Sequence, residues 1–129
     1  MHLDKIRTKF GKNSSVMIPL KRGGYFKAKL MDDGIWVSNL GNNPMLAWDV
    51  FHTAIELLVE RREVTKGDAM NYKLGGSGLP LDSIEGRVAY KVYGKKEGQS
   101  VFRRIVPIAA ILTLADICVD DEGILKLVE

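Results

Sequence analysis

The sequence is poor in the residues on which disulfide-bonded and metal-binding proteins depend. Its 129 residues include one cysteine and two histidines. A single cysteine, Cys118, cannot form an internal disulfide, and it fits a reducing compartment. No apolar run is long enough to span a bilayer, and residues 1–10 lack the apolar core of a signal peptide. These absences predict a cytoplasmic protein that does not cross a membrane.

Side chains for nucleophilic catalysis are equally scarce. Such catalysis needs a nucleophile, a base and a group that orients the base. Because His2 lies at the start of the chain, His52 is the one candidate base, with Asp49 and Glu56 on the same predicted helix face. That spacing suits a metal or an oriented base, but no second group of ligands accompanies it. We therefore favour a solvated polar stripe at His52, and we expect no enzyme activity, no metal and no cofactor.

The glycine-rich segment at residues 75–78 does not have the pattern of a phosphate-binding loop. It lacks the lysine and the following hydroxyl residue of a P-loop, and no buried strand precedes it. Asp82 stands at the start of the next predicted helix, where it would repel an anion. The segment is therefore interpreted as a linker. Cys118, which has no cation near it in the sequence, is interpreted as a small core residue.

The remaining composition is typical of one domain that builds its own core, with 46% hydrophobic and 27% charged residues. The net charge of +3 is unevenly distributed. Residues 1–43 hold eight basic and three acidic side chains, and residues 64–104 hold eight and four. Residues 44–63 hold two and four, and residues 105–129 hold one and five. The two basic blocks indicate either an anionic polymer as partner or a surface that only solubilises the protein.

Residues 44–63 predict the helix around which the rest of the chain is organised. Asn43 can cap its free amides, and Pro44 suits the first helical position because its missing N–H has no partner there. At about 100° per residue, apolar side chains cover most of the circumference, so the helix must be packed on two or three sides. These side chains are Ala47, Trp48, Val50, Phe51, Ala54, Ile55, Leu57 and Leu58.

The first third of the chain predicts a small antiparallel sheet. Residues 16–20 form a strand, and Pro19 favours an edge position for it. Residues 25–40 form a hairpin that turns at residues 32–34, where glycine tolerates a positive φ. The basic residues 1–14 show little apolar periodicity and are expected to be a loosely ordered lead.

Short helices are expected after the core helix. Thr65 and Asp68 have the spacing of a capping box, which predicts a helix of about two turns ending before Gly75. Asp82 and Glu85 form a second capping box, which predicts a helix over residues 82–93. Its inner face is Leu81, Ile84, Val88 and Val92, and its outer face is Ser83, Gly86, Arg87 and Tyr90. Gly86 inside this helix indicates a close approach by another group.

The C-terminal part combines a buried helix with a hairpin. Residues 101–106 fit either a strand or a first helical turn, and Pro107 favours a break. Residues 108–117 are apolar nearly all round, and residues 118–128 fit a hairpin turning at residues 120–123. The fold class is therefore α+β: one domain with a basic β-hairpin part (1–43) and a helical part (44–129) that ends in a β-hairpin.

A short capped helix, a glycine-containing turn and a second helix with a polar, basic outer face follow the long helix. Over about residues 44–106 this arrangement resembles a winged helix-turn-helix DNA-binding domain. The resemblance implies non-catalytic binding of double-stranded DNA, in transcription regulation or as an accessory to a DNA-processing system. The expected reading face is Ser83, Arg87, Tyr90 and Lys91. The expected phosphate contacts are Lys66, Lys73, Lys95, Lys96, Arg103 and Arg104.

Three other interpretations stay open. The chain is alternatively a protein-interaction or oligomerisation module, in which the strand edge at residues 16–20 and the apolar final segment form a homodimer interface. A small-molecule site between the sheet and the core helix, near Trp36, Trp48 and His52, is a third hypothesis. The plainest interpretation is an α+β domain whose lysines and arginines are only solvated.

Overall fold

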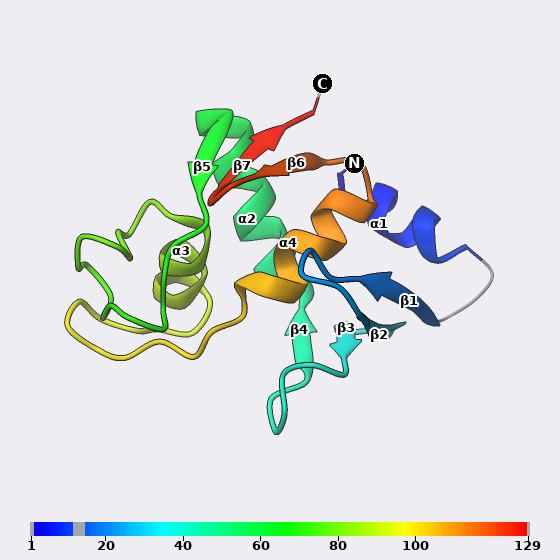
Figure 1. The fold of residues 1–129 in the computed structure, drawn as a ribbon, viewed down its shortest axis with the longest axis horizontal. Helices are drawn as coiled ribbons and strands as arrows, with labels where there is room; N and C mark the ends of the chain where they lie inside the picture. Colours follow the sequence, from blue (N-terminus) through cyan, green and yellow to red (C-terminus); the bar gives the residue numbers. More distant parts are fainter. Residues whose placement is uncertain (1, 12–14, 129) are drawn as a thin grey trace.

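The computed structural model describes residues 2–11 and 15–128, which form four helices and two antiparallel sheets (Figure 1). The α+β class is confirmed. One sheet has the strand order β1-β2-β3-β4 and the other β5-β7-β6. The elements in chain order are α1 (His2–Phe10), β1 (Ser15–Pro19), β2 (Tyr25–Leu30), β3 (Gly34–Val37), β4 (Met45–Ala47), α2 (Trp48–Arg61), β5 (Glu63–Thr65), α3 (Ile84–Lys91), α4 (Ile105–Leu114), β6 (Cys118–Asp121) and β7 (Ile124–Leu127).

The predicted N-terminal sheet is confirmed. β1 is an edge strand, as Pro19 indicated, and β2 and β3 form the expected hairpin around residues 31–33. Alternation along β2 buries Phe26 and Ala28 and leaves Lys27 and Lys29 exposed, so one face of the sheet covers the core. The outer face is open to solvent.

The core helix begins later than predicted. Met45–Ala47 pair with β3 as strand β4, so the helix starts at Trp48 and the expected cap by Asn43 and Pro44 is wrong. The pairing with β3 holds residues 45–47 in an extended conformation, and Ala47 occupies the N-cap without a side-chain hydrogen bond. The apolar face is as expected: Val50, Phe51 and their neighbours on that face are buried.

The N-terminal segment forms helix α1, contrary to the prediction that residues 1–14 are loosely ordered. Ile6 and Phe10 are four residues apart on one face of α1, and both are buried in the core. α1 packs against α4 and α2, and Lys9 forms an ion pair of 3.1 Å with Asp116. Residues 1 and 12–14 of the predicted lead lie outside the described residues.

The helix predicted from Thr65 to Leu74 is also wrong. Residues 63–65 are strand β5, in which buried Val64 lies opposite Leu125 of β7. The carboxylate of Asp68 accepts hydrogen bonds from the backbone N–H groups of Met70 and Asn71, at 3.0 and 3.1 Å. This side-chain turn competes with a helical backbone, and the chain continues as a loop.

The buried helix and the final hairpin are present. α4 starts at Ile105, three residues before the predicted start, because Pro107 sits in the first turn where its missing N–H leaves no hydrogen bond unmade. The helix lies in the middle of the molecule and contacts α1, β1 and β6 (Figure 1). β6 and β7 form the predicted C-terminal hairpin. No described helix is long and apolar enough to cross a membrane.

Residues 66–104 form a lobe beside the main core, seen on the left of Figure 1 as α3 flanked by two long loops. The lobe has a small core of its own, made of Leu74, Leu79, Ala89 and Val101. Ile84 and Val88 on α3 belong to the main core, so this helix is shared by both. In the sequence, β5 and residues 66–83 lie between α2 and α3, although the two helices pack together in the fold. The winged-helix-like bundle is therefore not confirmed, whereas the α+β class and the C-terminal hairpin are.

Candidate nucleic-acid interface

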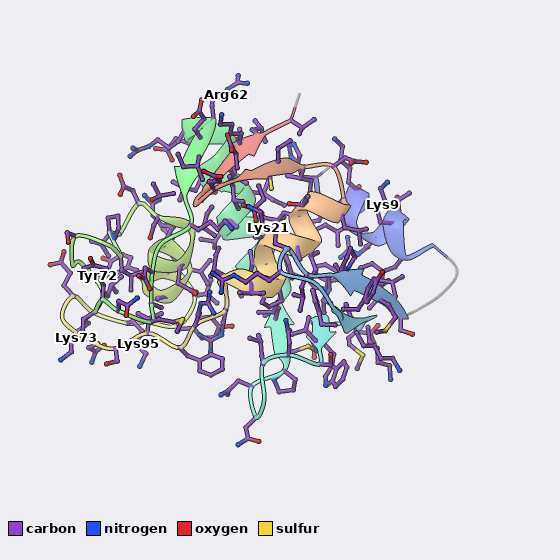
Figure 2. All side chains as sticks on the ribbon, in the orientation of Figure 1. Lys9, Lys21, Arg62, Tyr72, Lys73 and Lys95 are labelled. Carbon is purple, nitrogen blue, oxygen red and sulfur yellow. The ribbon has the colours of Figure 1, made fainter. Side chains whose placement is uncertain are left out.

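The two long loops of the lobe are tied together by backbone hydrogen bonds. The N–H of Leu74 donates to the carbonyl of Gln99 at 3.0 Å, and the N–H of Gly98 donates to the carbonyl of Leu74 at 2.8 Å. The N–H of Lys95 donates to Ala89 at the end of α3, at 3.0 Å. These bonds bring Lys73 and Lys95 to the same end of the lobe, where both are labelled in Figure 2.

The start of α3 faces the protein and not the solvent. Ser83 is the N-cap: its hydroxyl accepts a hydrogen bond from the N–H of Gly86 at 3.0 Å and donates to the carbonyl of Pro80 at 2.7 Å. The exposed fraction of Ser83 is 0%. A Cβ on Gly86 would collide with the carbonyl oxygen of Pro80. The close approach expected at Gly86 is therefore made by the chain itself.

The predicted outer face of α3 is thus wrong for Ser83 and Gly86. The loop of residues 66–83 folds over the first turn of the helix, and the N–H of Glu85 donates to the carbonyl of Lys66 at 2.9 Å. Arg87 is half-buried, and its Nε donates to the carbonyl of Leu81 at 3.1 Å. Tyr90, 51% exposed, and the exposed Lys91 are in the last turn. Only that end of the predicted reading face is open to a large ligand.

Glu85 has a role that the sequence did not indicate. Its Oε1 accepts hydrogen bonds from the backbone N–H groups of Arg104 and Ile105, at 2.8 and 2.9 Å, and so caps the first turn of α4. Burial raises the pKa of this carboxyl to about 7, although both hydrogen bonds and the positive charges of Arg104 and Arg103 act in the opposite direction. The capping box expected between Asp82 and Glu85 is therefore replaced by a contact between two helices.

Two of the predicted phosphate-binding cations are held by the protein itself. The guanidinium of Arg104 lies 3.6 Å from the ring centre of Tyr93 and 4.8 Å from that of Phe102. The Nζ of Lys66 is 2.7 Å from Oδ1 of Asp120, and the Lys66 side chain is 21% exposed. Both residues have contacts that stabilise the fold.

The other four predicted phosphate-binding cations, and Lys91 of the predicted reading face, are available at the surface. Lys73, Lys91, Lys96 and Arg103 are exposed, and Lys95 is half-buried. Within residues 2–11 and 15–128 no ion pair involves any of these five, which we call the lobe cations.

The acidic groups of the lobe are mostly engaged elsewhere. Asp82 pairs with Arg61 of α2 at 3.5 Å, and Glu85 is buried. Asp68 bonds to Asn71, and that side-chain hydrogen bond is the largest cause of a lowered pKa at Asp68. Among the described residues, Asp68 and the exposed Glu97 are the acidic groups of the lobe that neither pair with a basic side chain nor are buried, and the five lobe cations outnumber them.

The groups considered for catalysis or metal binding do not come together in a site. His52 and Glu56 form an exposed pair at 3.8 Å, and Trp48 packs between Phe51 and the guanidinium of Arg7. Cys118 is buried, and burial raises its pKa. In the part of the chain that the structure describes, no group of three or more histidine, cysteine or acidic side chains is placed to hold a metal ion.

Comparisons with known protein families, curated proteins and solved structures found no match to this chain.

Proposed function

We propose that the protein is a non-catalytic nucleic-acid-binding protein that binds double-stranded DNA through the lobe cations. The observation that carries this proposal is the set of five cations without ion pairs, on a lobe where Asp82 is paired with Arg61 and Glu85 is buried. Phosphate oxygens are the natural partners of such lysines and arginines, because each neutralised phosphate releases counterions from the duplex.

Binding of this kind contacts the DNA backbone more than the bases. The small residues expected to approach base edges, Ser83 and Gly86, are buried. Arg87 donates a hydrogen bond to the backbone of the loop that precedes α3. Phosphate contacts fix position but carry no sequence information. An accessory role in a DNA-processing system therefore fits this surface better than the reading of one specific operator.

The test is fluorescence anisotropy with a labelled duplex of mixed sequence, at about 50 and about 200 mM salt. Binding should weaken steeply with salt, with a slope of roughly −4.5 if all five lobe cations contact phosphates. The double variant Lys95→Glu, Lys96→Glu should bind much more weakly. The matched control is Lys27→Glu, Lys29→Glu, which makes the same charge change on the exposed face of β2.

Two outcomes would overturn the proposal. Absence of binding at the lower salt concentration would exclude DNA as a partner of this surface. An equal loss of affinity in both double variants would show that net charge, and not the lobe, governs the interaction.

A homodimer is a second candidate, favoured by the free edge of β1. Met17 in that strand, opposite Lys27, and Tyr25 in β2 are both exposed on the outer face of the sheet. A second copy of the chain could continue the sheet at this edge. Sedimentation of the wild-type chain and of Met17→Lys, at several concentrations, would distinguish a dimer from a monomer.

A further inference from the structure

A cleft of about 1120 Å³ lies between the two sheets, on the exposed side of α4. Its walls are the turn between β1 and β2 on one side, and the end of β5 with residues 66–68, 77, 78 and 80 of the lobe on the other. The volume lies just above the range of roughly 300–1,000 Å³ typical of pockets that bury small molecules. Lys21, from the turn, lies near the centre of the view in Figure 2.

The floor of the cleft is aliphatic because α4 presents small apolar side chains to it. Val106, Ala109, Ala110 and Leu114 lie along this side of the helix. From Val106 to Leu114 the helix rises by about 12 Å. Ile18, Pro19 and Leu20 extend the apolar surface onto the β1–β2 turn. Gly67, Gly78 and Gly123 also line the cleft.

The rim of the cleft is basic. Lys21, Arg22, Lys66 and Arg103 line it, against the two acids Asp68 and Asp120. Asp120 is engaged by both lysines, with Oδ1 at 3.1 Å from the Nζ of Lys21 and 2.7 Å from that of Lys66. Among the described residues, Arg22 and Arg103 form no ion pair. The side-chain hydrogen bond with Asn71 is the largest cause of the lowered pKa of Asp68, and the positive charge of Arg103 helps to lower it, so Arg103 acts electrostatically on that carboxyl. With neither guanidinium group held in an ion pair among the described residues, both can bind an anion beside the apolar floor.

The lining excludes two other classes of occupant. None of the described residues that line the cleft is aromatic, so a nucleobase would find no ring to stack on. A peptide would bring a backbone N–H and C=O at every residue over the apolar floor, where unpaired polar groups are costly. An alkyl chain has no such requirement.

We propose that this cleft binds an amphiphilic anion, with its alkyl or acyl chain along α4 and its carboxylate or phosphate head at Arg22 and Arg103. The apolar body loses water-exposed surface on the floor, and the head forms charge-assisted hydrogen bonds with the guanidinium groups. The site shares Arg103 with the proposed DNA contacts and is otherwise separate from them, at Lys73, Lys91, Lys95 and Lys96.

The test uses dansylundecanoic acid, whose emission rises in an apolar site, and its methyl ester as the uncharged counterpart. The acid should bind saturably to the full chain, and the ester should bind about tenfold more weakly because it lacks the charge. Arg22→Glu should weaken binding of the acid by about tenfold, with no change for the ester. Lys27→Glu, the same charge change on the outer face of the sheet, should leave both affinities within about twofold.

Amide NMR shifts with unlabelled decanoate provide a second, independent measurement. The proposal expects the shifts to be confined to residues 18–22, 65–68 and 105–114. Equal binding of acid and ester would overturn it, as would shifts located elsewhere. If an alternating Glu-Leu peptide produces these shifts and decanoate does not, the cleft is a peptide site. Shifts that depend on protein concentration without ligand would assign the cleft to a second copy of the chain.

Discussion

The carboxylate of Glu85 accepts a hydrogen bond from the backbone N–H of Ile105 at 2.9 Å, so a side chain of α3 caps α4. The first amides of a helix have no partner within the helix, and Arg104 at the N-cap of α4 provides no side-chain hydrogen bond for them. Glu85 thus joins the lobe to the central helix of the main core. The stability of that junction should depend on pH.

Glu85→Gln tests this dependence. In the unfolded chain the carboxyl titrates near 4.5, and in the fold burial raises its pKa to about 7. Between these values the folded state holds a proton that the unfolded state lacks, so stability from Glu85 is full below pH 4.5 and is lost as the pH rises through 7. Glutamine keeps an oxygen acceptor without the charge. Relative to wild type, the variant should gain up to about 3 kcal/mol in free energy of unfolding between about pH 5 and pH 8.

The measurement is urea unfolding followed by tryptophan fluorescence at several pH values in that interval. A difference between the two proteins that does not change with pH would contradict the raised pKa. A loss of stability in the variant at every pH would show that glutamine does not cap α4.

Ser83→Ala separates a structural from a DNA-reading role for this hydroxyl. Removal of the N-cap acceptor should lower the free energy of unfolding by about 1 kcal/mol. Because the side chain is buried, the affinity for duplex DNA should stay unchanged when it is measured below the melting transition. Ser100→Ala, at an exposed loop position, is the control for stability. If the folded Ser83→Ala variant binds DNA more weakly, Ser83 contacts the DNA and this prediction is wrong.

Gly86→Ala should lower the free energy of unfolding, although helix propensity alone predicts an increase. On propensity alone alanine would stabilise α3 by about 1 kcal/mol. The added Cβ would meet the carbonyl oxygen of Pro80 and lie 2.8 Å from the Ser83 hydroxyl oxygen, so the loop must move away. We expect a net destabilisation of about 1–3 kcal/mol in thermal or urea unfolding. A stabilised variant would show that residues 80–83 do not press on the helix.

Asp120→Asn removes the shared partner of two lysines at the cleft. Asp120 is 14% exposed, and both Lys21 and Lys66 lie within 3.1 Å of it. Loss of its charge should cost about 1–3 kcal/mol in free energy of unfolding. It should also tighten the binding of dansylundecanoic acid, because two ammonium groups become available to the head. Asp121→Asn, which affects the exposed pair with Lys126, should change neither quantity.

Local patterns predicted much of the fold. Alternation in β2 and the turn predicted at residues 32–34 identified the first hairpin, and the wide apolar face identified α2. Gly86 correctly indicated a close approach within α3. Each of these features depends on residues near one another in the sequence, where spacing alone carries the information.

The errors have one physical origin, which is contact between distant segments. Thr65 has the capping-box spacing to Asp68, which predicted the start of a helix. Pairing with β7 makes residues 63–65 a strand instead. α1 looked irregular because two buried residues, Ile6 and Phe10, are enough to anchor it to a core formed elsewhere. Ser83 looked exposed because the loop that covers it lies outside its helix. The cleft was not foreseen, since its residues come from both sheets.

The central position of α4 also bears on the order in which the chain folds. α1 and β1 pack against a helix that ends at Leu114, far along the sequence from Ile6, Phe10 and Ile18. Contacts between segments so distant in the sequence are slow to form, because a long loop must close first. Local pairing of β1 with β2 should therefore precede the docking of α1 and β1 on α4, which we expect to be a late step of folding.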